Sequence, residues 1–187
     1  AQVKQITQEL LKDPQKIVVD SSSKPHKDIV QSFYYSDNVT QKDMQLFKLL
    51  NIVQNEQAIV FTATRSDTSR IAALLNETGL NANALNGELL QKQRNQVLQD
   101  FSNGKFTILV TTDLASRGLD LVNVSLVINF DMPKHTEEFI HRIGRTGRAG
   151  SKGDAIALVG PKDWLSFKNV EGLLEQTIKF DQVENLK

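Results

Sequence analysis

Three arginines spaced three residues apart lie in the glycine-rich segment from His141 to Gly150. They are Arg142, Arg145 and Arg148. A guanidinium group is always charged, and its planar fork binds two phosphoryl oxygens at once, which a lysine ammonium group cannot do. Glycine has no β-carbon and lets a backbone approach a ligand closely. The segment therefore favours phosphate binding, whereas an isolated Arg-x-x-Arg pair is more often a solvated basic helix end.

A second polar segment, Thr111 to Asp120, directly follows the apolar run Thr107 to Val110. In open α/β sheets, ligands bind outside the carboxyl ends of the strands. Polar residues that follow a buried strand are therefore placed to meet a ligand. The position of this segment supports a binding role for both segments.

Together the two segments resemble the fifth and sixth motifs of superfamily 2 helicases. The amino-acid sequences of Ser116 to Asp120 and of His141 to Arg145 are similar to those of the corresponding motifs in the DEAD-box RNA helicase family. The resemblance covers roughly residues 28 to 160. It includes three more segments in the family's order, which are Ala58 to Thr64 (the fourth motif), Gln91 to Arg94 (the Gln-x-x-Arg element) and Asp131 to Pro133.

Several segments of a complete enzyme of this family are missing from the chain. It has no Gly-x-x-x-x-Gly-Lys-Ser/Thr phosphate loop, no Asp-Glu-Ala-Asp segment and no Ser-Ala-Thr segment. The family places these in its first domain, so the resemblance implies the second of two RecA-like domains from a longer enzyme. The implied fold is α/β, a RecA-like three-layer α/β/α sandwich with a mainly parallel sheet. A smaller departure is Asn86-Gly87 in place of the usual His-Gly, which leaves a local turn contact open.

The resemblance also implies roles at the nucleotide. Arg145 and Arg148 match the pair that reaches across the interdomain cleft to the γ-phosphate of ATP. Asp120, in the same loop as Gly118, matches the carboxylate that binds the ATP ribose, and His141 matches a residue that bridges to the first domain. Outside the motif context, Asp120 is better interpreted as a salt-bridged carboxylate and His141 as a surface histidine. ATP and Mg²⁺ are implied cofactors whose principal ligands lie in the first domain, with no metal ligand in this chain.

For RNA, the resemblance implies contacts to the sugar-phosphate backbone that do not depend on base sequence. The matching positions are Thr64, Gly87, Arg94, Thr112 and Gly118. For Thr64 and Thr112 the alternative is helix or turn capping. For Arg142, an intradomain ion pair is as plausible as a ligand contact.

The expected function is that of the C-terminal domain of an ATP-dependent RNA helicase. Such a domain supplies an arginine finger and RNA-backbone contacts for RNA-stimulated ATP hydrolysis and duplex unwinding, and we expect the isolated chain to be inactive. The expected partners are RNA and the N-terminal RecA-like domain of the same enzyme. Two alternatives remain, a DNA-directed superfamily 2 translocase domain and a non-enzymatic docking module.

Composition agrees with a single domain. The chain has 187 residues with 22 acidic and 22 basic side chains, and this zero net charge argues against a globally basic nucleic-acid binder. All arginines fall between positions 65 and 148, near the motifs. The absence of cysteine excludes disulfides and thiolate metal sites. No apolar run approaches the ~18 to 20 residues of a membrane span, and no signal-peptide pattern is present, so we expect a soluble, cytoplasmic protein.

Short, continuous apolar runs predict strands covered on both faces. These runs are residues 29–35, 58–61, 82–85, 107–110, 126–128 and 155–159. Helical spacing and glycine stops predict the intervening helices. The helices are expected over residues 41–51, 66–78, 91–103, 136–143 and 164–175. We expect an interdomain linker region over residues 1–27 with a short helix at 5–11, the domain over 28–175, and a C-terminal extension over 176–187.

Overall fold

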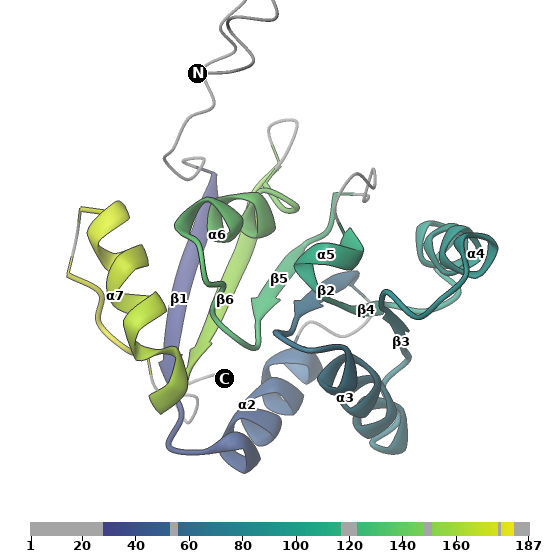
Figure 1. Ribbon diagram of the computed structural model, residues 1–187, viewed down its shortest axis with the longest axis horizontal. Coiled ribbons are helices and arrows are strands. Elements are labelled where there is room, and N and C mark those ends of the chain that lie inside the picture. Colours follow the sequence, from purple (N-terminus) through teal and green to yellow (C-terminus); the bar gives the residue numbers. More distant parts are fainter. Residues whose placement is uncertain (1–27, 53–55, 117–122, 148–150, 176, 182–187) are drawn as a thin grey trace, which may run out of the picture.

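The computed structural model describes residues 28–52, 56–116, 123–147, 151–175 and 177–181. Strands and helices alternate along these residues, as the apolar runs predicted (Figure 1). The strands are β1 (Ile29–Tyr35), β2 (Ala58–Phe61), β3 (Ala82–Leu85), β4 (Ile108–Thr111), β5 (Leu126–Asn129) and β6 (Gly153–Val159). The helices are α2 (Val39–Ile52), α3 (Arg65–Glu77), α4 (Gln91–Ser102), α5 (Asp113–Ser116), α6 (Thr136–Ile143), the 3₁₀ turn η1 (Pro161–Asp163) and α7 (Trp164–Leu173).

The strands form one sheet in the order β1-β6-β5-β2-β4-β3, and every described strand pair is parallel. The predicted mainly parallel sheet is confirmed. The central strands β5, β2 and β4 are buried along their whole length, as continuous apolar sequence predicts for strands with helices on both faces. Because the strands run the same way, their carboxyl ends meet at one edge of the sheet.

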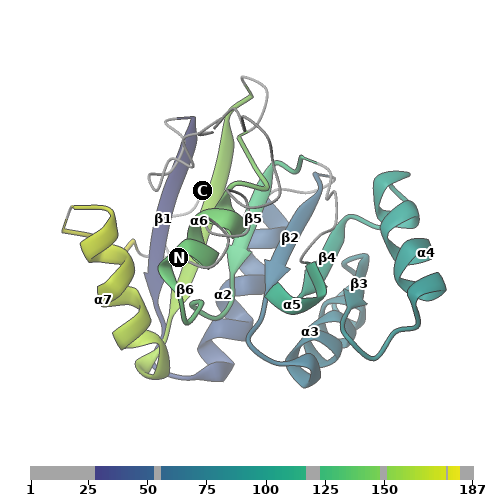
Figure 2. The same ribbon diagram turned by 45° about the horizontal axis from the view of Figure 1, so that its top comes forward.

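Two layers of helices enclose the sheet, which confirms the predicted three-layer sandwich (Figures 1 and 2). On one face, Leu46 of α2 and Ile71 of α3 pack in one apolar cluster with residues of the central strands. On the other face, Phe101 of α4 packs in a second cluster, and Phe139 of α6 and Phe167 of α7 pack in a third.

The expectation that all strands are covered on both faces is wrong at β1. Val30 is 57% exposed, and with Ile52 and Ile156 it lines a groove of about 190 Å³ beside α2. The described part of this layer has two helices, α2 and α3, for six strands. The edge strand is therefore left partly open on that face.

The bounds of β1, β2, β3 and α6 are those predicted, and the other predicted elements differ by one or two residues at an end. The short helix α5 and the turn η1 were not predicted. The glycine stops are confirmed, since Gly79 and Gly104 follow α3 and α4 with φ of +87° and +71°. Strand β4 ends one residue later than predicted, at Thr111, whose buried hydroxyl donates to the carbonyl oxygen of Leu85 at 3.0 Å. Thr111 therefore belongs to the sheet and not to the binding segment that follows it.

Residues 177–181, within the expected C-terminal extension, pack on the domain. Asp181 forms a parallel bridge with Tyr34, and its N–H donates to the carbonyl oxygen of Phe33 at 2.8 Å. Burial, and then the charge of Asp181, raise the pKa of Tyr34. The helix predicted at residues 5–11 lies outside the described residues. Among the helices described, none has the length and apolarity needed to span a bilayer.

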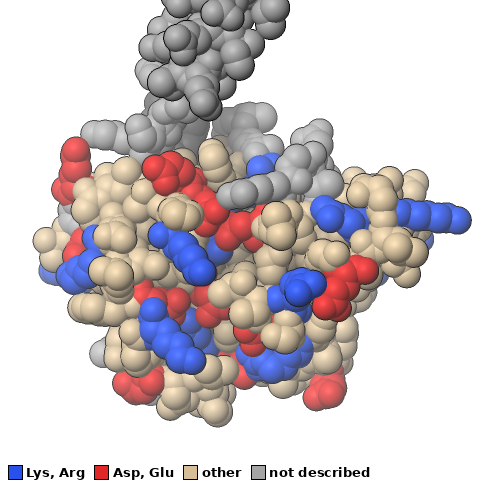
Figure 3. Space-filling model, viewed as in Figure 1, with Lys and Arg blue, Asp and Glu red and all other residues tan. Residues whose placement is uncertain are grey.

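Basic and acidic side chains are interspersed on the face that carries α4 to α7 (Figure 3). The arginines are concentrated in one part of the sequence, but the described Lys and Arg side chains on this face do not form a continuous basic patch. The charge distribution therefore favours a small number of placed contacts to an anionic ligand over broad electrostatic attraction.

Candidate functional site

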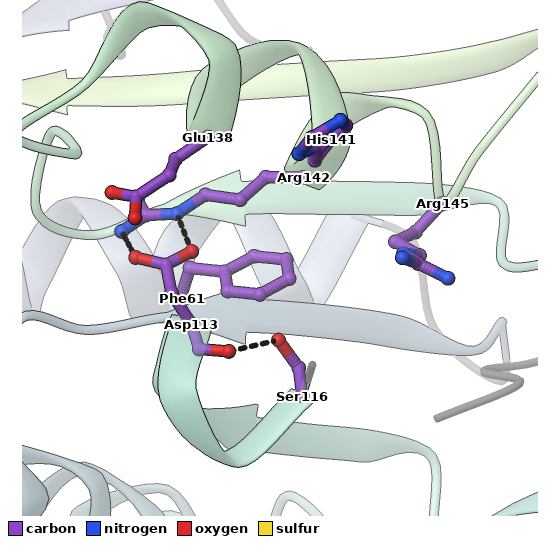
Figure 4. A pocket seen from close by; sticks show the side chains of 7 residues that line it. All are labelled: Phe61, Asp113, Ser116, Glu138, His141, Arg142 and Arg145. Carbon is purple, nitrogen blue, oxygen red and sulfur yellow. Dashed lines mark hydrogen bonds and ion pairs between the residues drawn. The ribbon is translucent and has the colours of Figure 1, made fainter. Parts of the chain in front are cut away.

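A pocket of about 450 Å³ lies at the carboxyl end of β2, between α5 and α6. From β2 and its neighbour β5 the chain leaves in opposite directions across the sheet, to β3 and to β6. This is the topological switch point, where ligands of open α/β sheets bind. The pocket is lined by Phe61, Asp113, Ser116, Glu138, His141, Arg142 and Arg145 (Figure 4).

Arg142 is the buried centre of this site, with 2% of its side chain exposed. Its Nε donates to Oδ1 of Asp113 at 2.7 Å, and its Nη2 donates to Oδ2 at 2.6 Å. This is the fork geometry in which guanidinium and carboxylate groups bind each other most strongly. The sequence left open whether Arg142 contacts a ligand or forms an intradomain ion pair, and the structure contains the ion pair.

Other groups at the ends of the strands complete the environment of Arg142. Its Nη1 donates to Oδ1 of Asn129 at 2.9 Å and to the carbonyl oxygen of Asp131 at 2.7 Å. The guanidinium lies over the ring of Phe61, 5.1 Å from the ring centroid. Through these contacts Arg142 connects α6 with the ends of β2 and β5 and with α5, which follows β4.

Side chains of α6 and of the residues just after it line the pocket next to Arg142. His141 is exposed and Arg145 is half-buried, and Figure 4 shows Arg145 and Glu138 at opposite ends of the pocket. Glu137 and Glu138 lie in the first turn of α6, and His141 and Arg142 lie in its last turn. This charge order stabilises the helix, since its amino end carries partial positive charge and its carboxyl end partial negative charge.

Gly147 fixes the chain that leaves α6, in a way the sequence did not predict. Its φ is +67°, and a β-carbon here would lie 2.6 Å from Cγ1 of Ile29. A β-carbon at Gly153 would collide with the side chain of Thr146. The glycine at position 147 therefore allows the chain at Thr146 and Gly147 to pack closely against Ile29 and Gly153.

Three of the expected site residues lie outside the described residues. They are Gly118, Asp120 and Arg148. Of the expected nucleotide-facing residues, His141 and Arg145 are described and line the same pocket. No group of three or more His, Cys, Asp or Glu side chains among the described residues is arranged to hold a metal ion.

The two threonines expected to contact RNA both cap helices. Thr64 is exposed, and its Oγ1 accepts from the N–H of Asp67 at 3.1 Å at the start of α3. Thr112 is 8% exposed, and its Oγ1 accepts from the N–H of Ala115 at 3.4 Å. The capping alternative is therefore present at both positions, and the exposed Thr64 is the better placed of the two to meet a ligand as well.

Arg94 and Gly87 lie at the same edge of the sheet. Nη2 of Arg94 donates to the carbonyl oxygen of Ala115 at 2.8 Å, so Arg94 ties α4 to α5. Gly87 is exposed in the turn after β3. Asn86, which replaces the usual histidine, makes the turn contact itself, since its Oδ1 accepts from the N–H of Glu88 at 3.1 Å.

Sequence reasoning missed Asp113, Asn129 and Glu138 as site residues. A signal existed for Asp113 and Asn129, because both lie at or just after the end of a buried strand. Glu138 precedes Arg142 by one helical turn, on the same face of α6.

Comparison with known proteins gives consistent matches. The helicase conserved C-terminal domain family matches residues 41–150. The chain is 37% identical to the ATP-dependent RNA helicase SrmB of Escherichia coli over 185 residues, or 99% of this chain. It is also 37% identical to the ATP-dependent RNA helicase DeaD of Haemophilus influenzae over 183 residues, or 98% of this chain. The chain spans 42% and 30% of the length of these two relatives.

Solved structures match the fold. The DEAD-box protein SrmB of E. coli, bound to regulator of ribonuclease activity A, superposes with a TM-score of 0.80 at 39% identity, covering 85% of this chain and 94% of that one. Dbp5 of S. cerevisiae, bound to RNA and ADP BeF3, superposes with a TM-score of 0.82 at 26% identity, covering 98% of this chain and 49% of that one. The family match, these relatives and the RecA-like fold show that the chain belongs to the helicase C-terminal domains of the DEAD-box RNA helicase family.

Proposed function

We propose that this chain is the second RecA-like domain of an ATP-dependent RNA helicase, in which Arg145 and Arg148 act as arginine fingers on the γ-phosphate. The observation that carries the proposal is the buried pair of Arg142 and Asp113 at the switch point of the sheet. This pair holds α6 so that His141 and Arg145 line an open pocket. The site is thus built to present cationic and imidazole groups to an anion.

Phosphoryl transfer needs positioning and compensation of charge on the transferring group more than it needs covalent chemistry. Arg145 fits that task, because it lies on the rim of the pocket, at the end of an anchored helix. Magnesium, when bound, neutralises charge on the phosphates. As the resemblance implies, we assign the principal Mg²⁺ ligands and the phosphate loop to the first domain.

RNA binding is proposed along the carboxyl edge of the sheet. Thr64, Gly87 and Thr112 follow β2, β3 and β4, which are neighbours in the sheet. Residues that follow neighbouring parallel β-strands lie side by side, so they can contact successive phosphates of one RNA strand. Such contacts read the sugar-phosphate backbone and carry no base specificity.

The test is lysine substitution of each proposed finger in the full-length enzyme. Arg148→Lys and Arg145→Lys keep the charge and lose the fork, and we expect RNA-stimulated ATP hydrolysis to fall by ~10³ to 10⁵ for a residue that acts as the finger. Binding of RNA without nucleotide should not change. Arg65→Lys is the matched control, because its side chain is 62% exposed and lies outside the pocket.

The same assays separate the alternatives. Hydrolysis within a few-fold of the parent in both finger variants would show that neither arginine acts on the γ-phosphate. Stimulation of the parent by single-stranded DNA and not by RNA would favour a DNA-directed translocase. A docking module would show no RNA-stimulated hydrolysis in the full-length parent.

A further inference from the structure

Lys42 in α2 lies outside every motif segment, and yet its side chain is only 6% exposed. Its ammonium nitrogen donates to the carbonyl oxygen of Phe130 at 2.7 Å, to Oδ2 of Asp163 at 2.6 Å and to Oδ1 of Asp131 at 3.4 Å. An ammonium group has three protons to donate, so all three are used. Burying a charge is costly unless it is paired and hydrogen-bonded, and this lysine is both.

Asp131 connects this junction to the functional edge of the sheet. Its Oδ1 faces Lys42, and its Oδ2 accepts from the N–H of Ala63 at 2.9 Å. Its carbonyl oxygen accepts from Nη1 of Arg142 at 2.7 Å. One residue therefore joins α2, the turn after β2 and the anchor of α6.

The turn after β2 carries Thr64, the exposed residue that we propose contacts RNA. Ala63 and Thr64 are both exposed, so packing against neighbouring side chains does little to fix their backbone. The hydrogen bond from Ala63 to Asp131 ties this turn to the segment after β5, 68 residues away. A turn held in its binding conformation binds more tightly than one that must be ordered on binding.

We propose that Lys42 and Asp131 are positioning residues of the RNA-binding edge. Lys42 holds the carboxylate of Asp131, and that carboxylate holds the turn of Ala63 and Thr64 in place relative to Arg142. The inference rests on the proposed RNA contact at Thr64. It assigns a role in RNA binding to a lysine of α2 whose own side chain is buried.

The experiment uses the 187-residue chain and a short, fluorescein-labelled oligouridylate, with binding followed by anisotropy well below the melting temperature of every variant. Asp131→Ala removes the acceptor for Ala63, and we expect the dissociation constant to rise about three- to tenfold, as for loss of one hydrogen bond. Asp131→Asn keeps a carbonyl oxygen that can accept from the N–H of Ala63, so its affinity for RNA should lie close to that of the parent. Thr64→Ala should weaken binding and thereby tests the contact itself.

Asp163→Asn is the control for a merely structural role. Asp163 makes the shorter contact with Lys42, and it also accepts from the N–H groups of Met132 and Gly160, but it does not contact Ala63. We expect Asp163→Asn to lower the melting temperature at least as much as Asp131→Ala, while the dissociation constant for RNA changes less than twofold.

Each outcome decides one question. If Asp163→Asn weakens RNA binding as much as Asp131→Ala does, affinity follows stability and the positioning role is wrong. If Thr64→Ala weakens binding and Asp131→Ala does not, the positioning role is wrong and the RNA contact stands. If Thr64→Ala binds as well as the parent, the RNA contact is wrong, and the positioning role is overturned with it.

Discussion

Arg142 in the last turn of α6 and Asp113 at the start of α5 form a two-bond ion pair, with donor-to-acceptor distances of 2.7 and 2.6 Å. Asp113 belongs to the segment that resembles the fifth helicase motif, and Arg142 belongs to the segment that resembles the sixth. A bidentate pair tolerates little change in distance or angle. The proposed nucleotide-facing and RNA-facing segments therefore share one anchor.

Loss of Asp113 should destabilise the domain. Asp113→Ala leaves the buried guanidinium of Arg142 with neutral oxygen partners only. We expect the free energy of unfolding to fall by about 3 kcal/mol. This is the lower end of the range for a broken buried pair, because the side chain of Asp113 is 25% exposed. For a chain of this size the melting temperature should fall by roughly 6 to 12 °C. Glu88→Gln is the control, since Glu88 and Arg65 form an exposed pair that contributes less than ~1 kcal/mol. Equal melting temperatures for the Asp113 variant and its parent would contradict this role.

Gly147→Ala should destabilise the domain more than an ordinary glycine substitution. A left-handed conformation costs a residue with a β-carbon roughly 1 to 2 kcal/mol. At Gly147 the added carbon would also overlap the side chain of Ile29. Overpacking of this kind typically lowers the stability by a further ~1 to 3 kcal/mol. Gly79→Ala is the matched control, because Gly79 has a φ of +87° and no atom within 4 Å of the added carbon. Chemical denaturation of both variants measures the difference, and equal losses would show that the contact with Ile29 relaxes freely.

Acid should release the segment of residues 177–181 from α7. Glu171 accepts from Nζ of Lys168 at 2.6 Å and from the N–H of Ile178 at 3.1 Å, and these two bonds hold the pKa of Glu171 below its ordinary value of 4.5. A carboxyl with a lowered pKa stabilises the fold above its unfolded pKa, and this contribution is lost as pH falls through the folded pKa. We therefore expect the segment to detach below pH 4.5.

The sole tryptophan reports this detachment. Trp164 stacks on Phe180 with 6.4 Å between the ring centroids, so its fluorescence should change in the same pH range. Glu171→Ala should show the acid-type fluorescence already at neutral pH. Asp100→Asn, which removes another carboxyl with a lowered pKa, should leave the transition unchanged. Far-UV circular dichroism separates local release from unfolding, and a transition that persists in Glu171→Ala would assign it to another group.

RNA binding by this chain alone should depend only shallowly on salt. The candidate phosphate contacts in the described residues are few, at Thr64, Gly87, Arg94 and Thr112, and the chain has no net charge. One to three neutralised phosphates imply a logarithmic slope of roughly 1 to 2, at about 0.7 per phosphate for single strands. Anisotropy titrations with oligouridylate and oligoadenylate over a salt series measure the slope and the base preference. A steep slope, or strong preference for one base, would reveal a binding surface beyond these residues.

The sequence alone was sufficient to predict most of the strands and helices that carry the site, but not the short helix α5, Asp113–Ser116. Continuous apolar runs identified β2, β4 and β5, and the spacing before the arginines identified α6 with its observed bounds, Thr136–Ile143. These features are local, because burial on both faces, helical periodicity and glycine stops each leave a pattern within a few residues. The motif segments are local as well, and they were sufficient to indicate the family.

Only the tertiary structure decided what each charged group does. Arg142 and Asp113 are 29 residues apart, and Lys42 and Asp131 are 89 residues apart. These pairs meet because β2 lies between β5 and β4 and because α2 begins at the carboxyl edge, after β1. No local pattern encodes that order of strands. Lys42 lies on the same helical face as Leu46 and Leu49, where periodicity predicts an apolar residue. Its charge is accommodated there because the folded chain brings two carboxylates and a carbonyl oxygen to the same point.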